Sequence, residues 1–170
     1  SYVQTNVRSG KMFENDDLRH AMKYGINRSE FVNKIIGVPG YKVAFGVIPD
    51  YMPGSKPGST LRRENPLSYA DNNLATAKKH LKSYLAATKQ SKVPGFTILS
   101  GDSTRAKKYA EYFQSQLAKI FETEVKIENV PFKTRLQKMR DGAFDVVMAG
   151  WCPDYNDAMT GVDAVVAQGI

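Results

Sequence analysis

The chain has 170 residues, of which 42% are hydrophobic and 24% are charged. These proportions predict a globular protein and exclude a disordered tail or a fibre. The longest apolar stretch, Val146 to Cys152, is far shorter than the ~20 residues that cross a bilayer, so we expect no membrane-spanning helix. Cys152 is the only cysteine, which excludes an internal disulfide framework and a multi-cysteine zinc site.

The charge balance is basic, with 24 Lys and Arg against 17 Asp and Glu and a net charge of +7. Such a balance permits nucleic acid, an anionic membrane or an acidic partner without deciding the fold. Most of the cations fall on predicted helices, where a solvated face is the ordinary interpretation. The chain opens on Ser1 without a basic and apolar leader, so we expect no signal peptide within it and interpret it as a piece of a larger protein.

In the first 37 residues the pattern predicts one strand and two helices. Residues 2–6 alternate as a short strand. Asn15, followed by two acidic residues, predicts the start of a helix that ends at Gly25. Asn27, with an acid three residues on, predicts a second helix start, and Gly37 predicts the end of that helix.

Periodicity fails between residues 38 and 73, where repeated proline and glycine predict a long connection. A connection of this length inside a compact domain is usually functional or packs as an extended arm. Asp71 is the expected N-cap of the next helix, whose apolar stripe runs from Leu74 to Leu85.

The second half alternates strands with helices, which indicates βαβ units and therefore an α/β fold with a parallel or mixed sheet flanked by helices. In the last of these helices, Phe132, Leu136 and Met139 are expected to face inward, and residues 158–168 are weakly helical. The expected elements are strands over Phe96–Leu99, Val125–Val130 and Phe144–Ala149, a helix capped by Asp102 or Ser103, and a helix over Phe132–Arg140.

Enzyme signatures are absent from the sequence. It contains no glycine-rich phosphate motif and no GxSxG element. His20 and His80 lie in separate predicted helices without metal-type spacing, so a surface or packing role is the ordinary interpretation. Cys152 has no neighbouring histidine, and the Asp154/Asp157 pair has no evident general-base partner. We therefore expect no hydrolase and no enzyme.

The informative stretch is residues 148–157, just beyond the carboxyl end of a predicted buried strand. Open α/β sheets place their ligand crevices at that edge. Trp151 (the only tryptophan), Tyr155 and Asp154 put aromatic side chains beside a carboxylate, a combination that suits a cationic, partly apolar ligand. A strand-to-loop turn with a core tryptophan and capping aspartates fits the composition equally well.

Three stretches resemble the extracellular solute-binding proteins of oligopeptide and dipeptide ABC transporters. Residues 18–28 resemble the family pattern L-R-x-A-[LMF]-x-x-[AG]-[IM]-[DN]-R, and residues 46–49 resemble its G-x-[IT]-P segment. Residues 145–156 resemble the ligand-site strand of the oligopeptide binders. The resemblance implies one lobe of a two-lobed, periplasmic-binding-protein type II-like fold, with residues 1–170 as a fragment of the C-terminal ligand-binding lobe.

The same resemblance implies a non-catalytic, extracytoplasmic receptor that captures short peptides for a membrane permease, as a monomer and without nucleic acid or cofactor. Asp154 would pair with the peptide's α-amino group, and Trp151 would line a side-chain pocket. The backbone of Gly150 and Cys152 would pair with the peptide as an added strand. The ligand-binding residues expected on this basis are Gly150, Trp151, Cys152, Asp154 and Tyr155.

The sequence departs from the family pattern at two positions. Met148 stands where some oligopeptide binders carry an arginine, and Ala106 stands where some carry a histidine, so the group that anchors the peptide's C-terminus stays open. The family also contains nickel, glutathione and sugar binders. A basic nucleic-acid-binding domain is the alternative from another class.

Overall fold

The computed structural model describes residues 2–39, 52–64, 66 and 71–149 of the chain. They form a mixed α/β structure with a four-stranded sheet in the order β1-β4-β2-β3. β2 pairs in parallel with both β3 and β4, whereas β1 runs antiparallel to β4. The predicted mixed sheet is confirmed. The strands are β1 (Tyr2–Thr5), β2 (Phe96–Gly101), β3 (Val125–Val130) and β4 (Val146–Ala149).

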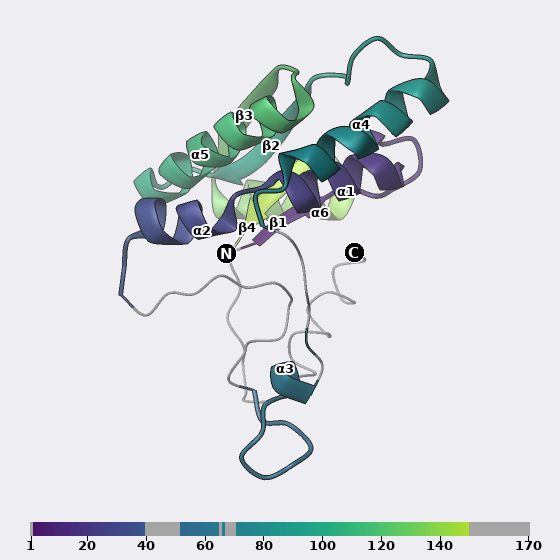
Figure 1. Ribbon diagram of the computed structural model, residues 1–170. Coiled ribbons are helices and arrows are strands. Elements are labelled where there is room, and N and C mark those ends of the chain that lie inside the picture. Colours follow the sequence, from purple (N-terminus) through teal and green to yellow (C-terminus); the bar gives the residue numbers. More distant parts are fainter. Residues whose placement is uncertain (1, 40–51, 65, 67–70, 150–170) are drawn as a thin grey trace.

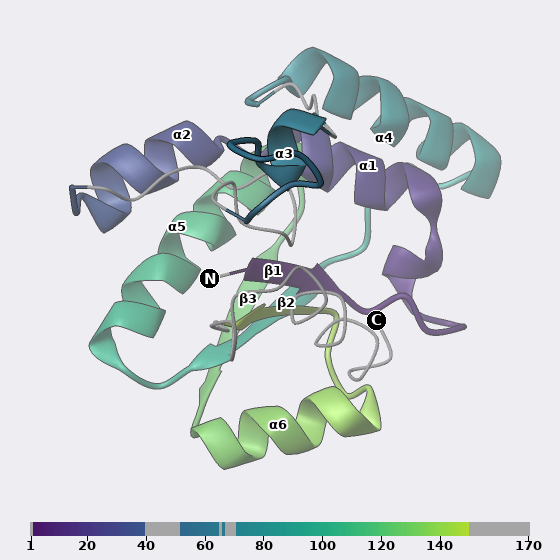
Figure 2. The same ribbon diagram turned by 90° about the horizontal axis from the view of Figure 1, so that it is seen from below.

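Helices cover both faces of this sheet (Figures 1 and 2). α5 (Thr104–Phe121) connects β2 to β3, and α6 (Phe132–Asp141) connects β3 to β4. These two crossovers run in opposite directions across the sheet, so their right-handedness puts the helices on opposite faces. α1 (Asp16–Gly25) and α4 (Leu74–Thr88) pack together on the α5 side. Among the described residues, no helix is long and apolar enough to span a bilayer.

Two predicted helix starts are confirmed by their caps. The Asn15 side chain accepts hydrogen bonds from the backbone N–H groups of Asp17 and Leu18 at the start of α1. The Asn27 side chain accepts from the Glu30 N–H at the start of α2 (Arg28–Glu30). The helix continues as a π-helical segment, η2 (Phe31–Ile36), which the apolar spacing did not reveal.

The predicted role of Asp71 is wrong. Asn73 caps α4, because its side-chain oxygen accepts from the Thr76 N–H at 3.0 Å. Asp71 instead caps α2, where its carboxylate accepts from the backbone N–H of Arg28 at 2.7 Å and of Ser29 at 3.0 Å. The C-terminal end of the long connection is thereby held against the start of α2, a contact between residues 42 or 43 positions apart that local sequence does not encode.

Asp71→Asn is expected to lower the free energy of unfolding by about 1–2 kcal/mol at neutral pH, because the amide keeps one of the two acceptor oxygens and loses the charge that strengthens the hydrogen bonds from Arg28 and Ser29. Burial acts to raise the pKa of Asp71, but the hydrogen bonds from Ser29 and Arg28 hold it below its ordinary value. A lowered pKa stabilises the fold above the unfolded-state pKa of about 4, and that contribution is lost as pH falls through the folded-state pKa. Urea unfolding at pH 7 and at pH 3 tests this, with the exposed Asp102→Asn as the control. If Asp71→Asn lowered the free energy of unfolding equally at pH 7 and at pH 3, the stabilising role of the Asp71 charge would be contradicted.

The described part of the long connection contains a small closed unit. Pro53 bridges Thr60, and a short helix, α3 (Leu61–Glu64), follows. The Glu64 carboxylate turns back and accepts hydrogen bonds from the backbone N–H groups of Ser55 and Lys56. The predicted loss of periodicity is correct, but this segment closes on itself, and it lies apart from the sheet (Figure 1).

Candidate functional site

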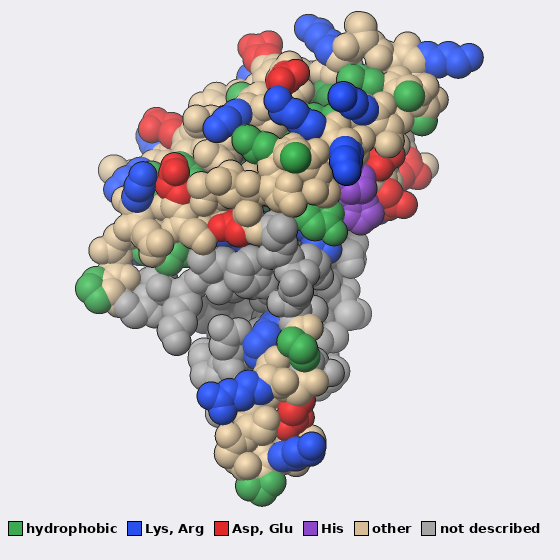
Figure 3. Space-filling model, in the orientation of Figure 1, with side chains coloured by type: hydrophobic (Ala, Val, Ile, Leu, Met, Phe, Trp, Pro, Cys, Tyr) green, Lys and Arg blue, Asp and Glu red, His purple; other side chains and the backbone are tan. Residues whose placement is uncertain are grey.

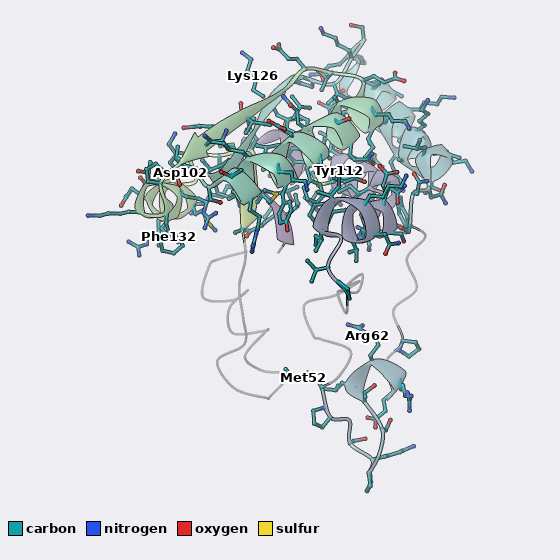
Figure 4. All side chains as sticks on the ribbon, turned by 90° about the vertical axis from the view of Figure 1, so that its left-hand side faces the viewer. Met52, Arg62, Asp102, Tyr112, Lys126 and Phe132 are labelled. Atoms are coloured by element: carbon teal, nitrogen blue, oxygen red, sulfur yellow. The ribbon has the colours of Figure 1, made fainter. Side chains whose placement is uncertain are left out.

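The carboxyl ends of three strands define one edge of the sheet. β2, β3 and β4 run parallel, so Gly101, Val130 and Ala149 all end there. The chain leaves β2 for α5 and leaves β3 for α6, on opposite faces. This divergence of neighbouring connections is the arrangement that opens a ligand crevice in α/β sheets. Figure 4 shows Asp102 and Phe132, which follow β2 and β3, at the same end of the molecule.

The predicted binding stretch begins at this edge. β4 is buried along its whole length and lies between β1 and β2, with Ala149 opposite Tyr2 and Val147 opposite Leu99. The predicted buried strand is therefore confirmed, although it begins at Val146 and not at Phe144. The five expected ligand residues follow directly and lie outside the described residues: Gly150, Trp151, Cys152, Asp154 and Tyr155.

Phe132 corrects the sequence analysis, which placed it inward. Its side chain is 64% exposed. α6 begins at Phe132 only two residues after the end of β3, so its first turn has little sheet beneath it, whereas Leu136 and Met139 on later turns are half-buried. An exposed phenylalanine at the edge where α/β sheets commonly place a ligand crevice is a candidate contact. Periodicity alone could not find it, because the apolar stripe does not say where the sheet ends.

Arg135 lies at the same edge, one helical turn after Phe132 in α6. Its Nη1 donates to the carbonyl oxygen of Met148 at 3.4 Å, and its guanidinium carbon lies 5.3 Å from the centroid of the Phe132 ring. A Cβ on Gly101 would lie 3.4 Å from the same Nη1. The side chain thus contacts the end of β4 and the start of α6, and it lies beside the end of β2. Its position on a predicted helix indicates only a solvated cation.

The start of α5 completes the edge. The Ser103 hydroxyl accepts a hydrogen bond from the Ala106 N–H at 3.1 Å, so Ser103, not Asp102, is the cap. Ser100 is fully buried, and its hydroxyl lies 3.5 Å from the Ala106 carbonyl oxygen. Asp102 and Arg105 are exposed beside this cap, so the edge presents charge of both signs to solvent.

A cavity of about 230 Å³ lies elsewhere, on the α6 face near the start of β4. Asp145 in its wall accepts a hydrogen bond from the Thr97 N–H at 3.2 Å, and Glu128 pairs with Lys138. Its carboxylates are therefore engaged within the fold, and it is not the predicted site. Its lining is Lys11, Thr97, Leu99, Glu128, Ala143, Phe144 and Asp145.

The two histidines, remote in sequence, meet where α1 packs on α4. Their ring centroids are 4.9 Å apart, and His80 Nδ1 lies 2.9 Å from a carboxylate oxygen of Asp17. The described residues contain no group of three or more side chains able to hold a metal ion. This cluster joins two helices, as the interpretation of packing residues predicts.

The basic residues lie mainly on exposed helix surfaces. Lys78, Lys79 and Lys82 on α4 and Lys107 and Lys108 on α5 are all exposed. On the face seen in Figure 3, the Lys and Arg side chains are dispersed among neutral groups and some acidic ones. That distribution agrees with the expected solvated faces.

Comparison with known proteins identifies the family. The family model described as bacterial extracellular solute-binding proteins, family 5 Middle, matches residues 1–169. The periplasmic oligopeptide-binding protein OppA of Escherichia coli is 30% identical over 145 residues, which are 85% of this chain and 26% of that protein. A dipeptide-binding protein of Lactococcus lactis is 29% identical over 157 residues, 88% of this chain and 27% of that protein. The chain thus spans about a quarter of the curated relatives it matches.

Solved structures agree. A peptide-binding protein of a peptide ABC transporter superposes with a TM-score of 0.85 at 29% identity, covering 95% of this chain and 71% of that one. Listeria monocytogenes OppA bound to peptide gives a TM-score of 0.85 at 26% identity, covering 96% of this chain and 33% of that one. The expected fold class is confirmed, and the chain belongs to the bacterial extracellular solute-binding proteins of family 5.

Proposed function

We propose that this chain contributes the ligand-binding edge of a non-catalytic, peptide-capturing component of an ABC transporter. One observation carries the proposal: buried β4 ends at the edge where the connections from β2 and β3 diverge, and residues 150–155 are the next in the sequence. The named relatives that bind oligopeptides and dipeptides support peptides as the ligand class.

The proposed contacts follow from the chemistry of those residues. The Asp154 carboxylate pairs with the free α-amino group of the peptide. The main chain of Gly150 and Cys152 pairs with the peptide backbone, which gives affinity with little dependence on side chains. Trp151 and Tyr155 supply apolar contact area with a polar edge. Phe132, exposed at the same edge, extends this aromatic surface.

The proposed organisation has residues 1–170 as part of a C-terminal lobe that closes on the peptide against a second lobe by a hinge motion. The protein acts outside the cytoplasm as a monomer and delivers its peptide to a membrane permease, without nucleic acid. Residues 38–73 form the long connection within the lobe. The relatives described as periplasmic support this location.

Peptides with a free amine are expected to bind at least tenfold more tightly than their N-acetylated counterparts, because a charged hydrogen bond is worth ~1.5–3 kcal/mol net. Calorimetric titration of both peptide sets against the longest natural form of the protein that contains this chain measures the difference. Equal affinity for both peptide sets would contradict the proposed contact.

Salt separates the proposal from the nucleic-acid alternative. Phosphate contacts weaken steeply with ionic strength, whereas one amine contact with main-chain bonds responds mildly. Titrations at low and high salt, with an oligonucleotide, nickel, glutathione and a sugar in parallel, complete the test. Binding of one of these in place of the peptides would overturn the proposed ligand class.

A further inference from the structure

His20 and His80 form an accessible pair of imidazoles where α1 packs on α4. Their ring centroids are 4.9 Å apart, with 35° between the ring planes. His20 is exposed, and the side chain of His80 is 28% exposed. Figure 3 shows histidine at the surface next to acidic side chains. An ion in the solvent can therefore reach this pair.

The Asp17 carboxylate fixes the tautomer of His80. His80 Nδ1 lies 2.9 Å from an Asp17 oxygen, and an ionised carboxylate can only accept a hydrogen bond, so Nδ1 carries the proton. In the neutral ring the lone pair then belongs to Nε2. Among the described residues, Nε2 has no hydrogen-bond partner and is not one of the buried unpartnered atoms. A carboxylate behind an imidazole is the arrangement that orients histidine ligands in metal sites.

The spacing of the two rings fits a metal ion bound by both. A ring nitrogen lies ~2.0–2.1 Å from a bound zinc ion, so two imidazoles on one ion, at bond angles of about 90–109°, have their centroids roughly 4.5–5.2 Å apart. The 4.9 Å between His20 and His80 lies within that range. Packed rings can have the same spacing, and what distinguishes this pair is the accessible Nε2 with a carboxylate behind its ring.

The helices hold these groups in place before any ion binds. Asp17, His20 and Tyr24 are three and four residues apart in α1, so they fall on one face of that helix. The Tyr24 ring stacks parallel to the His80 ring, with 3° between the planes and 5.9 Å between the centroids. His80 is thus fixed by a hydrogen bond at Nδ1 and by a ring beside it.

We propose that His20 and His80 together bind one divalent transition-metal ion, with Asp17 as the positioning residue for His80. The described residues contain no group of three or more metal-binding side chains, so water completes the coordination. Imidazole ligands suit zinc, nickel and copper, whereas magnesium prefers oxygen ligands. The bound ion would join α1 to α4 and stabilise their packing. The site belongs to these two helices alone, so it does not depend on the proposed peptide binding.

Calorimetric titration with zinc chloride tests the site in the longest natural form of the protein that contains this chain. Cys152→Ser serves as the background for all variants, because a thiolate binds the same ion. Zinc is expected to bind and to raise the melting temperature, whereas magnesium chloride should do neither. His20→Gln and His80→Gln should each lower the zinc affinity at least tenfold, since the remaining imidazole would hold the ion alone.

Asp17→Asn and Asp16→Asn form a matched pair of charge losses. Removing the carboxylate behind a histidine ligand costs ~10–100-fold in metal affinity, so Asp17→Asn should weaken zinc binding by about that factor. Asp16 pairs with Arg19 instead, and its substitution should leave the affinity unchanged. Melting temperatures without metal establish that the variants fold. Electron paramagnetic resonance of bound copper gives an independent reading, because nitrogen couplings from the imidazoles should be lost in both histidine variants.

The outcomes decide each part of the proposal. Absence of zinc binding, or an affinity that neither histidine substitution lowers, would overturn the site. An affinity that falls in only one histidine variant would show that the two rings do not share an ion, which also overturns it. Equal losses in Asp16→Asn and Asp17→Asn would refute the positioning role of Asp17. Peptide titrations of the histidine variants should match those of the unsubstituted protein, so a failure of the proposed function would be seen separately.

Discussion

Phe13→Ala is expected to lower the free energy of unfolding by about 3–5 kcal/mol, the usual cost of removing a fully buried phenylalanine. Phe13 is 0% exposed and lies in a 3-10 turn, η1 (Met12–Glu14). Its ring packs edge-on against Phe96 at 5.2 Å and Phe121 at 5.9 Å between centroids, and those two rings contact each other at 5.5 Å. Truncation would leave a cavity at the junction of β2, α5 and the N-terminal segment.

Urea unfolding followed by circular dichroism measures this effect. Phe132→Ala is the matched control, because it makes the same substitution at a side chain that is 64% exposed, and surface changes usually stay within about 0.5 kcal/mol. Equal destabilisation by the two variants would contradict the assigned core, since burial of the ring is the only reason for the expected difference.

Asp154→Asn is expected to abolish the preference for a free amine and to leave the fold intact. Removing one partner of a desolvated ion pair in a closed site costs about 3–5 kcal/mol, which would reduce the affinity for free-amine peptides to that of N-acetylated ones or below. The neutral amide keeps the shape of the side chain, so the loss reports charge, not packing.

Titration of both peptide sets against both proteins forms a thermodynamic cycle that isolates the contact. Asp157→Asn, three residues on in the same stretch, is the matched control for loss of a negative charge. Amine preference that persists in Asp154→Asn, or that is lost equally in Asp157→Asn, would show that another group recognises the amine.

Much of the secondary structure could be predicted because it is encoded locally. Asn15 and Asn27 satisfy N–H groups within three residues, and a αL conformation at Gly37 and Gly142 ends the helices that precede them. The continuous apolar run of β4 indicated a strand covered on both faces, and the sheet confirms it. The stretch after β4 is a predicted ligand site because it follows the carboxyl end of a buried strand. The roles of its residues stay predictions.

Contacts between distant segments could not be predicted from pattern alone. Phe13 stood outside every amphipathic stripe, yet it lies at the centre of the aromatic core. Asp71 has the sequence context of a cap for the helix that follows it, but it caps α2, because the end of the long connection packs against the turn between α1 and α2. The hydrogen-bond partner of Asp71 depends on a tertiary contact between segments 43 residues apart, which the residues next to Asp71 do not encode.

The sequence by itself therefore determined the order of strands and helices, the right-handed α/β architecture and the family, since these depend on local periodicity, caps and motifs. Tertiary structure alone decided which side chains lie at the carboxyl edge of the sheet. Phe132 is exposed because the sheet ends beneath it, and Arg135 reaches the Met148 carbonyl because α6 starts beside the end of β4. The environments of Phe132 and Arg135 both depend on where the strands and α6 end relative to one another. Packing across the whole sheet sets those positions.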